Sequence, residues 1–285
     1  MQYKYIELKT YKCITQYRLI AMDHANYYCK NRNEFFGEDG HKKLLEGLKM
    51  FIPQNTEKQN ICLDVGCCIG KYLDTFNDIC KEKQIICFEP NPANLEILKP
   101  KLRDIDNITL YECCISDKET TANFYNYKTK SENNAGNGLA GLRSGGDKIC
   151  SVDVVRLDTV LEKEICADDF TLKLVKIDTE GNDTNVIKSL GRFLQNTEYI
   201  IFECSDCLDD HRGPGFLNPM KDIVDYLSEN GFDTYRIGTK KLLKVNDEYW
   251  DDTYEKIKFF SNCFALKKND AIINKLIDPT FQYTY

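Results

Sequence analysis

The sequence predicts an α/β protein built on a mainly parallel β-sheet with helices on both faces. From residue 60 onward, short apolar runs alternate with helical segments, which is the pattern of repeated strand–helix–strand units. Acidic residues and glycines follow the first two runs, at the strand ends where open parallel sheets bind their ligands. These observations give both the fold class and the expected place of the site.

Five apolar runs are the expected strands: "NICLDVG" (60–66), "QIICFEP" (84–90), "ITLYECCIS" (108–116), "LKLVKID" (172–178) and "EYIIFECS" (198–205). Helices are expected in "KYLDTFNDICKE" (71–82), "NPANLEILKPKLRD" (91–104) and "DTNVIKSLGRFL" (183–194). Two late segments, "FDTYRIG" (232–238) and "NCFALKK" (262–268), are expected to form an antiparallel pair at the sheet edge.

One stretch departs from this alternation. "TTANFYNY" (120–127) and "CSVDVVRLDTVL" (150–161) are expected to be the strands of a hairpin. The polar, glycine-rich segment between them is long for a loop in a compact domain. Residues 131–146 are therefore either a lid over a substrate or a disordered hairpin tip.

Residues 1–55 are predicted to be an N-terminal helical extension and a candidate substrate-binding cap, ahead of a main domain at 56–285. In "HKKLLEGLKMFI" (41–52), apolar residues fall on one stripe of a half-buried helix: Leu44, Leu45, Leu48 and Phe51. Four earlier aromatic residues are either a wall that stacks on a sugar or part of the core: Tyr27, Tyr28, Phe35 and Phe36.

Composition excludes some classes of protein. The 285 residues carry a net charge of −7, which disfavours nucleic acid as a partner because such binding relies on clustered Lys and Arg. No apolar run reaches the roughly 18 residues of a membrane span. The first residues lack the apolar core of a signal peptide, so we expect a cytoplasmic protein.

The chain has 14 cysteines, and many of them fall inside expected strands. In a reducing compartment such cysteines act as small buried hydrophobic residues. "CSDC" (204–207) is a C-x-x-C pair without a second pair nearby, so a structural zinc site with its four ligands is the lesser alternative.

The first expected strand ends on Asp64, and Gly66 and Gly70 frame the turn into the next helix. Glycine lets the backbone approach a ligand closely, and a helix start offers free N–H groups. Glu89 ends the second strand about 20 residues further on, where an acid binds ribose hydroxyls. The turn lacks the G-x-G-x-x-G triplet of dinucleotide sites. S-adenosylmethionine, with its positive amino and sulfonium groups, is therefore favoured, with a simple tight turn as the alternative.

Five segments, taken in order, resemble FkbM-type S-adenosylmethionine-dependent methyltransferases: "LDVGCCIGKY", "CFEPNPANLEIL", "CCISDKE", "VVRLDTVL" and "VKIDTEGNDTNVIKSL". The resemblance implies a Rossmann-like class I methyltransferase fold, with a mainly parallel seven-stranded sheet and one antiparallel edge strand. It also implies O-methylation of sugars or other small hydroxylated molecules. Cys67 and Cys68 stand where the family usually carries Ala and Asn, and Asp183 stands where Glu is usual.

The resemblance also implies, position by position, a cofactor site. Its methionine end would be held by Asp64, Gly66, Cys68 and Gly70, with Tyr72 closing over it. Its ribose would be bound by Glu89, with Pro90 and Asn91 beside it. Its adenine would be flanked by Ser116 and Asp117.

Asp178 ends the strand expected beside the cofactor strand, and it is the expected base for a hydroxyl proton. Glu180 either holds Asp178, binds substrate or caps the helix that begins near Asn182. His211 is a second candidate base or an exposed loop residue. A divalent cation between Asp178 and the acids after the next strand would replace a base, with a solvated acidic loop as the alternative; these acids are Glu203, Asp206, Asp209 and Asp210.

The leading interpretation is an O-methyltransferase that acts on a glycan or a small metabolite. RNA ribose 2′-O-methylation is the second, because Lys176 precedes Asp178, although the acidic charge and the lack of a basic stripe oppose it. A non-catalytic partner subunit is the third, and the intact set of Asp64, Gly66, Glu89 and Asp178 argues against it. The acceptor and the oligomeric state stay open.

Overall fold

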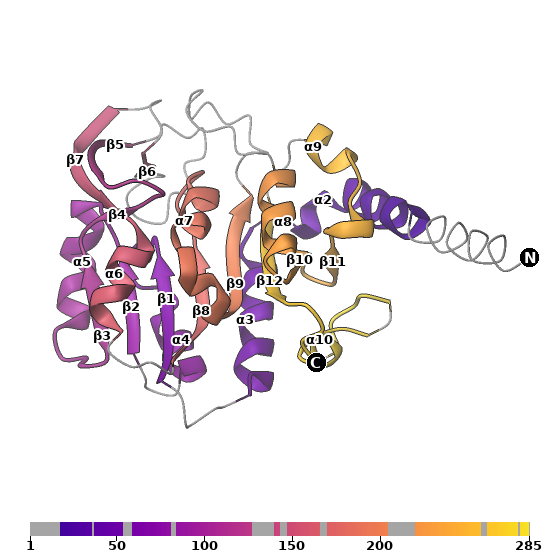
Figure 1. Ribbon diagram of the computed structural model, residues 1–285, viewed down its shortest axis with the longest axis horizontal. Coiled ribbons are helices and arrows are strands. Elements are labelled where there is room, and N and C mark those ends of the chain that lie inside the picture. The colour runs from indigo at the N-terminus through magenta and orange to yellow at the C-terminus, as the bar shows by residue number, and fades with distance from the viewer. Residues whose placement is uncertain are drawn as a thin grey trace, which may run out of the picture.

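An eight-stranded sheet in the order β11-β10-β12-β9-β8-β1-β2-β3 forms the centre of the molecule, as a computed structural model shows (Figure 1). The structure describes residues 18–35, 37–53, 59–80, 84–126, 140–142, 147–165, 170–204, 220–257, 261–278 and 280–284. Among these residues, no helix is long and apolar enough to cross a membrane.

The parallel part of the sheet consists of β1 (Gln59–Val65), β2 (Gln84–Phe88), β3 (Ile108–Tyr111), β8 (Phe170–Ile177) and β9 (Thr197–Cys204). Side chains of β1 alternate between two cores, with Ile61, Leu63 and Val65 in one and Cys62 in the other. Strands buried on both faces read as continuous apolar runs, which is why the sequence predicted them.

Helices cover the two faces of this sheet (Figure 1). The core that contains Leu63 also takes side chains from α6 (Leu157–Glu164), α7 (Asp183–Ser189) and α8 (Met220–Glu229). The opposite core takes them from α3 (Asp39–Phe51), α4 (Leu73–Cys80) and α5 (Pro92–Leu102). Helix α5 begins at Pro92 because the Asn91 side chain caps it by accepting the Ala93 N–H at 3.1 Å.

The predicted α/β class is confirmed, and so is the antiparallel pairing of 232–238 with 262–268, but this pair does not form the edge of the sheet. β12 (Ser261–Lys267) lies between β9 and β10 (Phe232–Ile237) and is antiparallel to both. The antiparallel strand is therefore inside the sheet, where its backbone N–H and C=O groups find partners on both sides. β11 (Leu242–Lys244) pairs with β10 and adds an eighth strand at the edge.

A second, four-stranded sheet stands beyond the carboxyl ends of β1 and β2 (Figure 1). It contains β4 (Cys114–Ile115), β5 (Thr120–Asn126), β6 (Ala140–Gly141) and β7 (Asp147–Val155). The antiparallel pairing of β5 with β7 confirms the predicted hairpin, but its second strand stops at Val155 and "LDTVL" starts helix α6. Apart from residues 140–142, the loop 131–146 lies outside the described residues.

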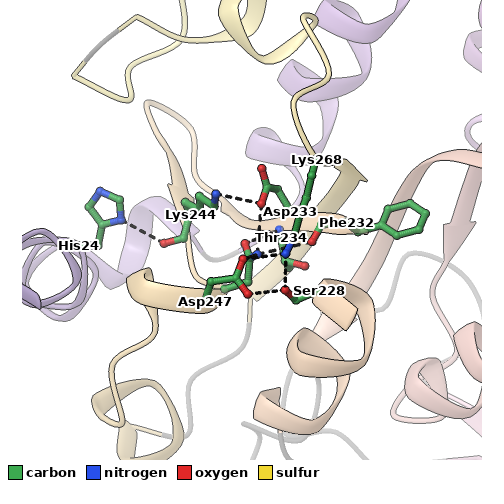
Figure 2. A network of polar contacts seen from close by, with 9 residues as sticks. His24, Ser228, Phe232, Asp233, Thr234, Lys244, Asp247 and Lys268 are labelled. Atoms are coloured by element: carbon green, nitrogen blue, oxygen red, sulfur yellow. Dashed lines mark hydrogen bonds and ion pairs between the residues drawn. The ribbon is translucent and has the colours of Figure 1, made fainter. Parts of the chain in front are cut away.

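The N-terminal segment packs on the last strands. It comprises a helical stretch over residues 18–30, α2 (Arg32–Phe35) and α3. His24 Nδ1 lies 3.0 Å from the carbonyl oxygen of Lys244 on β11, and Lys244 forms an ion pair with Asp233 of β10 at 2.9 Å (Figure 2). In the same network Asp247, in the 3-10 helix η3 (Asp247–Tyr249), contacts Lys268 at 2.9 Å.

The aromatic residues of this segment serve the core. Tyr28 and Phe35 are buried, and the Tyr27 hydroxyl donates to Glu34 at 2.6 Å. Tyr27, Tyr28 and Phe35 do not line the cavity described below, and Phe36 lies outside the described residues. The predicted division at residue 55 stays a prediction.

One cysteine pair departs from the expectation of free buried thiols. Cys62 on β1 and Cys80 on α4 form a disulfide, with Cα atoms 6.4 Å apart. Cys62 faces the layer in which α4 packs, so the tertiary structure brings the two sulfurs together. Four of the other cysteines that were predicted to be buried are free and buried: Cys67, Cys87, Cys113 and Cys114. Cys68 is free but only partly buried, which departs from the expectation.

Candidate functional site

A cavity of ≈ 380 Å³ opens at the carboxyl ends of β1, β2 and β8. Val65 and Phe88, which end β1 and β2, and Asp178, which follows β8, line it. It is also lined by Phe124 and Gly141 of the small sheet and by Leu142 just after β6. The volume is in the range of about 300–1,000 Å³ that is usual for sites of small molecules. The cavity therefore lies where the sequence placed the ligand.

The turn after β1 is built around close backbone contacts. Gly66 has φ +78°, and a Cβ there would lie 2.0 Å from the carbonyl oxygen of Asp178. Cys68 has φ +53°, which points its N–H toward Glu89 Oε2 at 2.8 Å. Only glycine fits at position 66, and the turn ties the ends of β1, β2 and β8 together.

Glu89 lies on the cavity wall and is only 4% exposed. Its Oε1 accepts the N–H of Asn91 at 2.8 Å and the side-chain amide of Asn94 at 3.3 Å, and its Oε2 accepts from Cys68. Burial raises the pKa of Glu89, and these donors act against the rise. A carboxylate has about four acceptor sites, so one remains for a ligand hydroxyl.

Asn94 adds a second acceptor to the same wall. Its side-chain oxygen is buried and accepts no hydrogen bond from the described residues. A buried acceptor without a donor is costly, and a ligand with a pair of hydroxyls would satisfy it together with Glu89.

Three charged groups form a cluster at the cavity, of which Lys176 and Asp64 are buried and Asp178 is partly exposed. Lys176 Nζ lies 3.2 Å from Asp64 Oδ1 and 3.6 Å from Asp178 Oδ2, and it donates to the Gly66 carbonyl at 3.0 Å. Asp64 is fully buried and does not reach the cavity surface. With all three groups ionised, the cluster carries a net charge of one negative unit, which suits a cationic ligand.

The charges in this cluster shift the pKa values of Lys176 and Asp64. Burial lowers the pKa of Lys176, but the two carboxylates outweigh it and hold the pKa above its usual value. Burial raises the pKa of Asp64, and the ammonium of Lys176 opposes this. Lys176 therefore stays protonated between two acids.

The segment after β8 presents Asp178 and Glu180 to the cavity. Both residues line it, and the Asp178 side chain is 44% exposed, so it is open to an acceptor. Glu180 has φ +55°. Asp183 holds this turn by accepting the Thr179 hydroxyl at 3.0 Å and the Gly181 N–H at 3.3 Å. Burial and the charge of Asp178 raise the pKa of Asp183 to about 6.

Tyr72 closes one side of the cavity. Its ring stacks on His41 at 4.9 Å, and Lys176 Nζ lies 5.6 Å from its centroid. Burial lowers the pKa of His41 to about 4, so this histidine is neutral. Tyr72 is thus fixed between a neutral ring and a buried cation.

The remaining predicted residues divide into two groups. Pro90 and Asn91 line the cavity, whereas Gly70, Ser116 and Asp117 do not. Ser116 Oγ lies 3.4 Å from Asn182 Oδ1, and the Asp117 carbonyl accepts from Arg156 at 2.7 Å. The cavity wall there is formed by the residues just before them, Cys113–Ile115.

Sequence reasoning missed several lining residues, namely Glu38, Lys71, Asn94, Cys113, Cys114 and Phe124. Only Asn94 carried a local signal, as a polar residue one turn into the helix that follows Glu89. Glu38 lies well before β1 in the sequence, so no local pattern around the site predicts that it lines the cavity.

His211 lies outside the described residues, as do Asp206, Asp209 and Asp210. In the part of the chain that the structure describes, no group of three or more His, Cys, Asp or Glu residues is arranged to hold a metal ion.

Comparison with known proteins gives a consistent picture. Residues 64–234 match a family model described as the methyltransferase FkbM domain. The 2-O-methyltransferase NoeI of Sinorhizobium fredii is 25% identical over 179 residues, which cover 59% of this chain and 74% of that protein.

Two solved structures are similar at low identity. The crystal structure of a methyltransferase FkbM from Methylobacillus flagellatus is 15% identical with a TM-score of 0.43, covering 75% of this chain and 45% of that one. Aeropyrum pernix fibrillarin in complex with S-adenosyl-L-methionine is 13% identical with a TM-score of 0.39, covering 79% of this chain and 74% of that one. The chain thus spans less than half of the Methylobacillus protein.

Proposed function

The chain belongs to the FkbM methyltransferase family of S-adenosylmethionine-dependent enzymes, and we propose that it methylates a hydroxyl of a sugar, a glycan or a small metabolite. The observation that carries this proposal is the half-exposed Asp178 carboxylate on the cavity wall, next to the buried Lys176–Asp64 pair. The relative named as a 2-O-methyltransferase supports oxygen as the methyl acceptor.

The residues of the cavity fit the methyl donor. Glu89 and Asn94 offer acceptors for the ribose hydroxyls, and the negative cluster of Asp64, Lys176 and Asp178 suits its positive amino and sulfonium groups. Gly66, Cys68 and Gly70 would shape the methionine end under Tyr72, and Pro90 and Asn91 would flank the ribose. Ser116 and Asp117 would act at the adenine end through Cys113–Ile115. When bound, the donor supplies an electrophilic methyl group.

Asp178 would accept the proton that the alcohol loses as its oxygen takes the methyl group. The electrons of the broken S–C bond stay on sulfur, and the proton ends on the Asp178 carboxylate. Lys176 Nζ, 3.6 Å from Asp178 Oδ2, would orient the carboxylate toward the acceptor. Glu180 would hold the acceptor beside Asp178. Tyr72, Phe88 and Phe124 contribute apolar surface to the cavity, and such surroundings favour a reaction in which charge disappears.

The two rival functions fit the cavity less well. RNA ribose methylation needs a surface that attracts phosphates, but the described lining residues carry four carboxylates and one ammonium: Glu38, Glu89, Asp178, Glu180 and Lys71. A non-catalytic subunit would not need an exposed carboxylate next to a donor-sized cavity. His211 and a divalent cation remain candidate aids to the reaction.

The test is methyl transfer from labelled S-adenosylmethionine to a panel of glycosides and hydroxylated metabolites. For Asp178→Asn we expect kcat to fall by about 10²–10⁴-fold, because a positioned base contributes that much. Asp74→Asn, an exposed change on α4, is the matched control and should keep full activity. Near-complete activity of Asp178→Asn on a true acceptor would show that the base lies elsewhere.

A further inference from the structure

The N-terminal segment, outside the matched residues 64–234, reaches the cavity. Glu38, just before α3, lies on the cavity wall, and its side chain forms an ion pair with Lys71, which also lines the cavity. Lys42 approaches the same carboxylate at 3.9 Å. The fold therefore brings Glu38, from the N-terminal segment, and Lys71, from the segment after β1, together at the cavity.

Close contacts with the sheet edge fix this segment in place. Glu34 Oε1 accepts the backbone N–H groups of Lys240 and Lys241, each at 3.0 Å. A Cβ on Gly40 would lie 2.9 Å from the backbone of Gly238, so the start of α3 touches the β10–β11 turn directly. Because contacts on both sides of Glu38 anchor the backbone, the carboxylate is held at the cavity.

The Glu38–Lys71 pair belongs to the Asp178 side of the cavity. Lys71 Nζ lies 5.5 Å from the centroid of the Tyr72 ring. Lys176 Nζ, which is 3.6 Å from Asp178 Oδ2, lies 5.6 Å from the same centroid. The adjacent Tyr72 ring rests on His41 of α3. The same helix therefore supports both the ion pair and the aromatic wall.

The charges on this wall discriminate between acceptors. The described lining residues carry four carboxylates and one ammonium, that of Lys71, which is paired with Glu38. Neutral hydroxyls can donate hydrogen bonds to such carboxylates, and these charge-assisted bonds are strong. A phosphate or carboxylate on the acceptor would meet like charges, which oppose its binding.

We propose that Glu38 and Lys71 form an acceptor-binding wall that selects an uncharged, hydroxyl-rich ring over its phosphorylated or carboxylated counterpart. Glu38 accepts a ring hydroxyl, and Lys71 holds the carboxylate and donates to a second acceptor oxygen. The inference rests on the proposed O-methyl transfer and adds the class of acceptor.

Binding to the full chain, saturated with S-adenosylhomocysteine, tests this without turnover. The probes are p-nitrophenyl β-glucoside, its 6-phosphate and p-nitrophenyl β-glucuronide. Saturation-transfer NMR and calorimetry measure the binding of each probe. We expect the neutral glucoside to bind about ten-fold or more tightly than either anion, since about 1.4 kcal/mol of repulsion gives that ratio. Equal or tighter binding of an anion, or no binding of the glucoside, overturns the inference.

Glu38→Gln tests the contribution of the acceptor-binding wall independently of donor binding. We expect about ten-fold weaker binding of the glucoside, because a charge-assisted hydrogen bond is lost, with unchanged donor affinity. Glu38 makes no side-chain capping bond to α3, and its ion pair with Lys71 is half exposed, so the variant should fold. Glu46→Gln, exposed on the same helix, is the control and should bind like the parent protein.

Glu38→Lys should erase or invert the preference for the neutral glucoside over its 6-phosphate. Unchanged glucoside binding in Glu38→Gln, or an equal loss of donor affinity, would refute the role of the wall. Failure of the proposed function is distinguishable, because the glucoside would then bind with the expected preference while no hydroxylated acceptor is methylated.

Discussion

Replacing Lys176 by Met removes the cation between Asp64 and Asp178 while keeping a side chain of similar length. Lys176 is 2% exposed and lies 3.2 and 3.6 Å from the two carboxylates. At an effective dielectric of about 20, each contact corresponds to about 5 kcal/mol of attraction, most of which offsets the desolvation of the ammonium. Removing one partner of such a buried set typically costs about 3–5 kcal/mol, and we expect that loss in the free energy of unfolding at pH 7.

Lys173→Met is a matched control in the same strand. Lys173 is also 2% exposed, but it pairs with the single carboxylate of Glu198, whose side chain is 33% exposed and can turn to water. The loss should therefore be about 1–2 kcal/mol, because no charge stays buried without a partner.

The pH dependence separates a charge effect from a packing effect. Burial holds the pKa of Asp64 in the folded state above its unfolded value of about 3.9, and Lys176→Met removes the opposing cation. A raised pKa means that the folded state is favoured below the unfolded pKa and loses stability as the pH rises through the folded pKa. The deficit of Lys176→Met should be greatest at pH 7 and should shrink toward pH 4. Urea unfolding followed by circular dichroism measures it. Equal losses in the two variants, or a deficit that does not change with pH, would refute the reasoning.

Two further predictions concern the donor pocket. Glu89→Ala should raise the Kd for S-adenosylmethionine by about 10–100-fold, because the proposed acceptor for the ribose is lost and the N–H groups of Cys68 and Asn91 lose their acceptor. Calorimetry measures the Kd, with the exposed Glu96→Ala as control, and an unchanged Kd would remove Glu89 from the proposed cofactor site. Gly66→Ala should lower the free energy of unfolding by about 2–5 kcal/mol, because its Cβ would collide with the Asp178 carbonyl at a φ of +78°; a melting temperature equal to that of the parent protein would show that the turn is looser than described.

The sheet strands could be predicted because burial on both faces leaves a mark in the sequence. β1, β2, β8 and β9 are rich in apolar residues, and β1, β2 and β8 end at the cavity or one residue before it. The antiparallel pairing of β10 with β12 was predicted and is confirmed, but the sequence did not predict that β12 also pairs with β9 or that β11 forms the edge. Antiparallel strands with similar patterns can pair in several orders, so tertiary packing decides their order.

The disulfide between Cys62 and Cys80 shows the same limit. Both residues look like small buried apolar side chains, and their separation of 18 residues along the chain carries no signal. The pair forms because α4 lies across the face of β1 to which Cys62 points.

The sequence by itself determined the class of fold, the glycine turn, and the acids at the ends of β1, β2 and β8, because each depends on residues that are neighbours along the chain. Tertiary structure decided what those acids do. It buried Asp64 out of reach, left Asp178 on the cavity wall, placed Lys176 between them, and brought Glu38 across from the N-terminal segment. The ionisation and reach of a carboxylate depend on its distance from other charges and from water, and those distances exist only once the chain has folded.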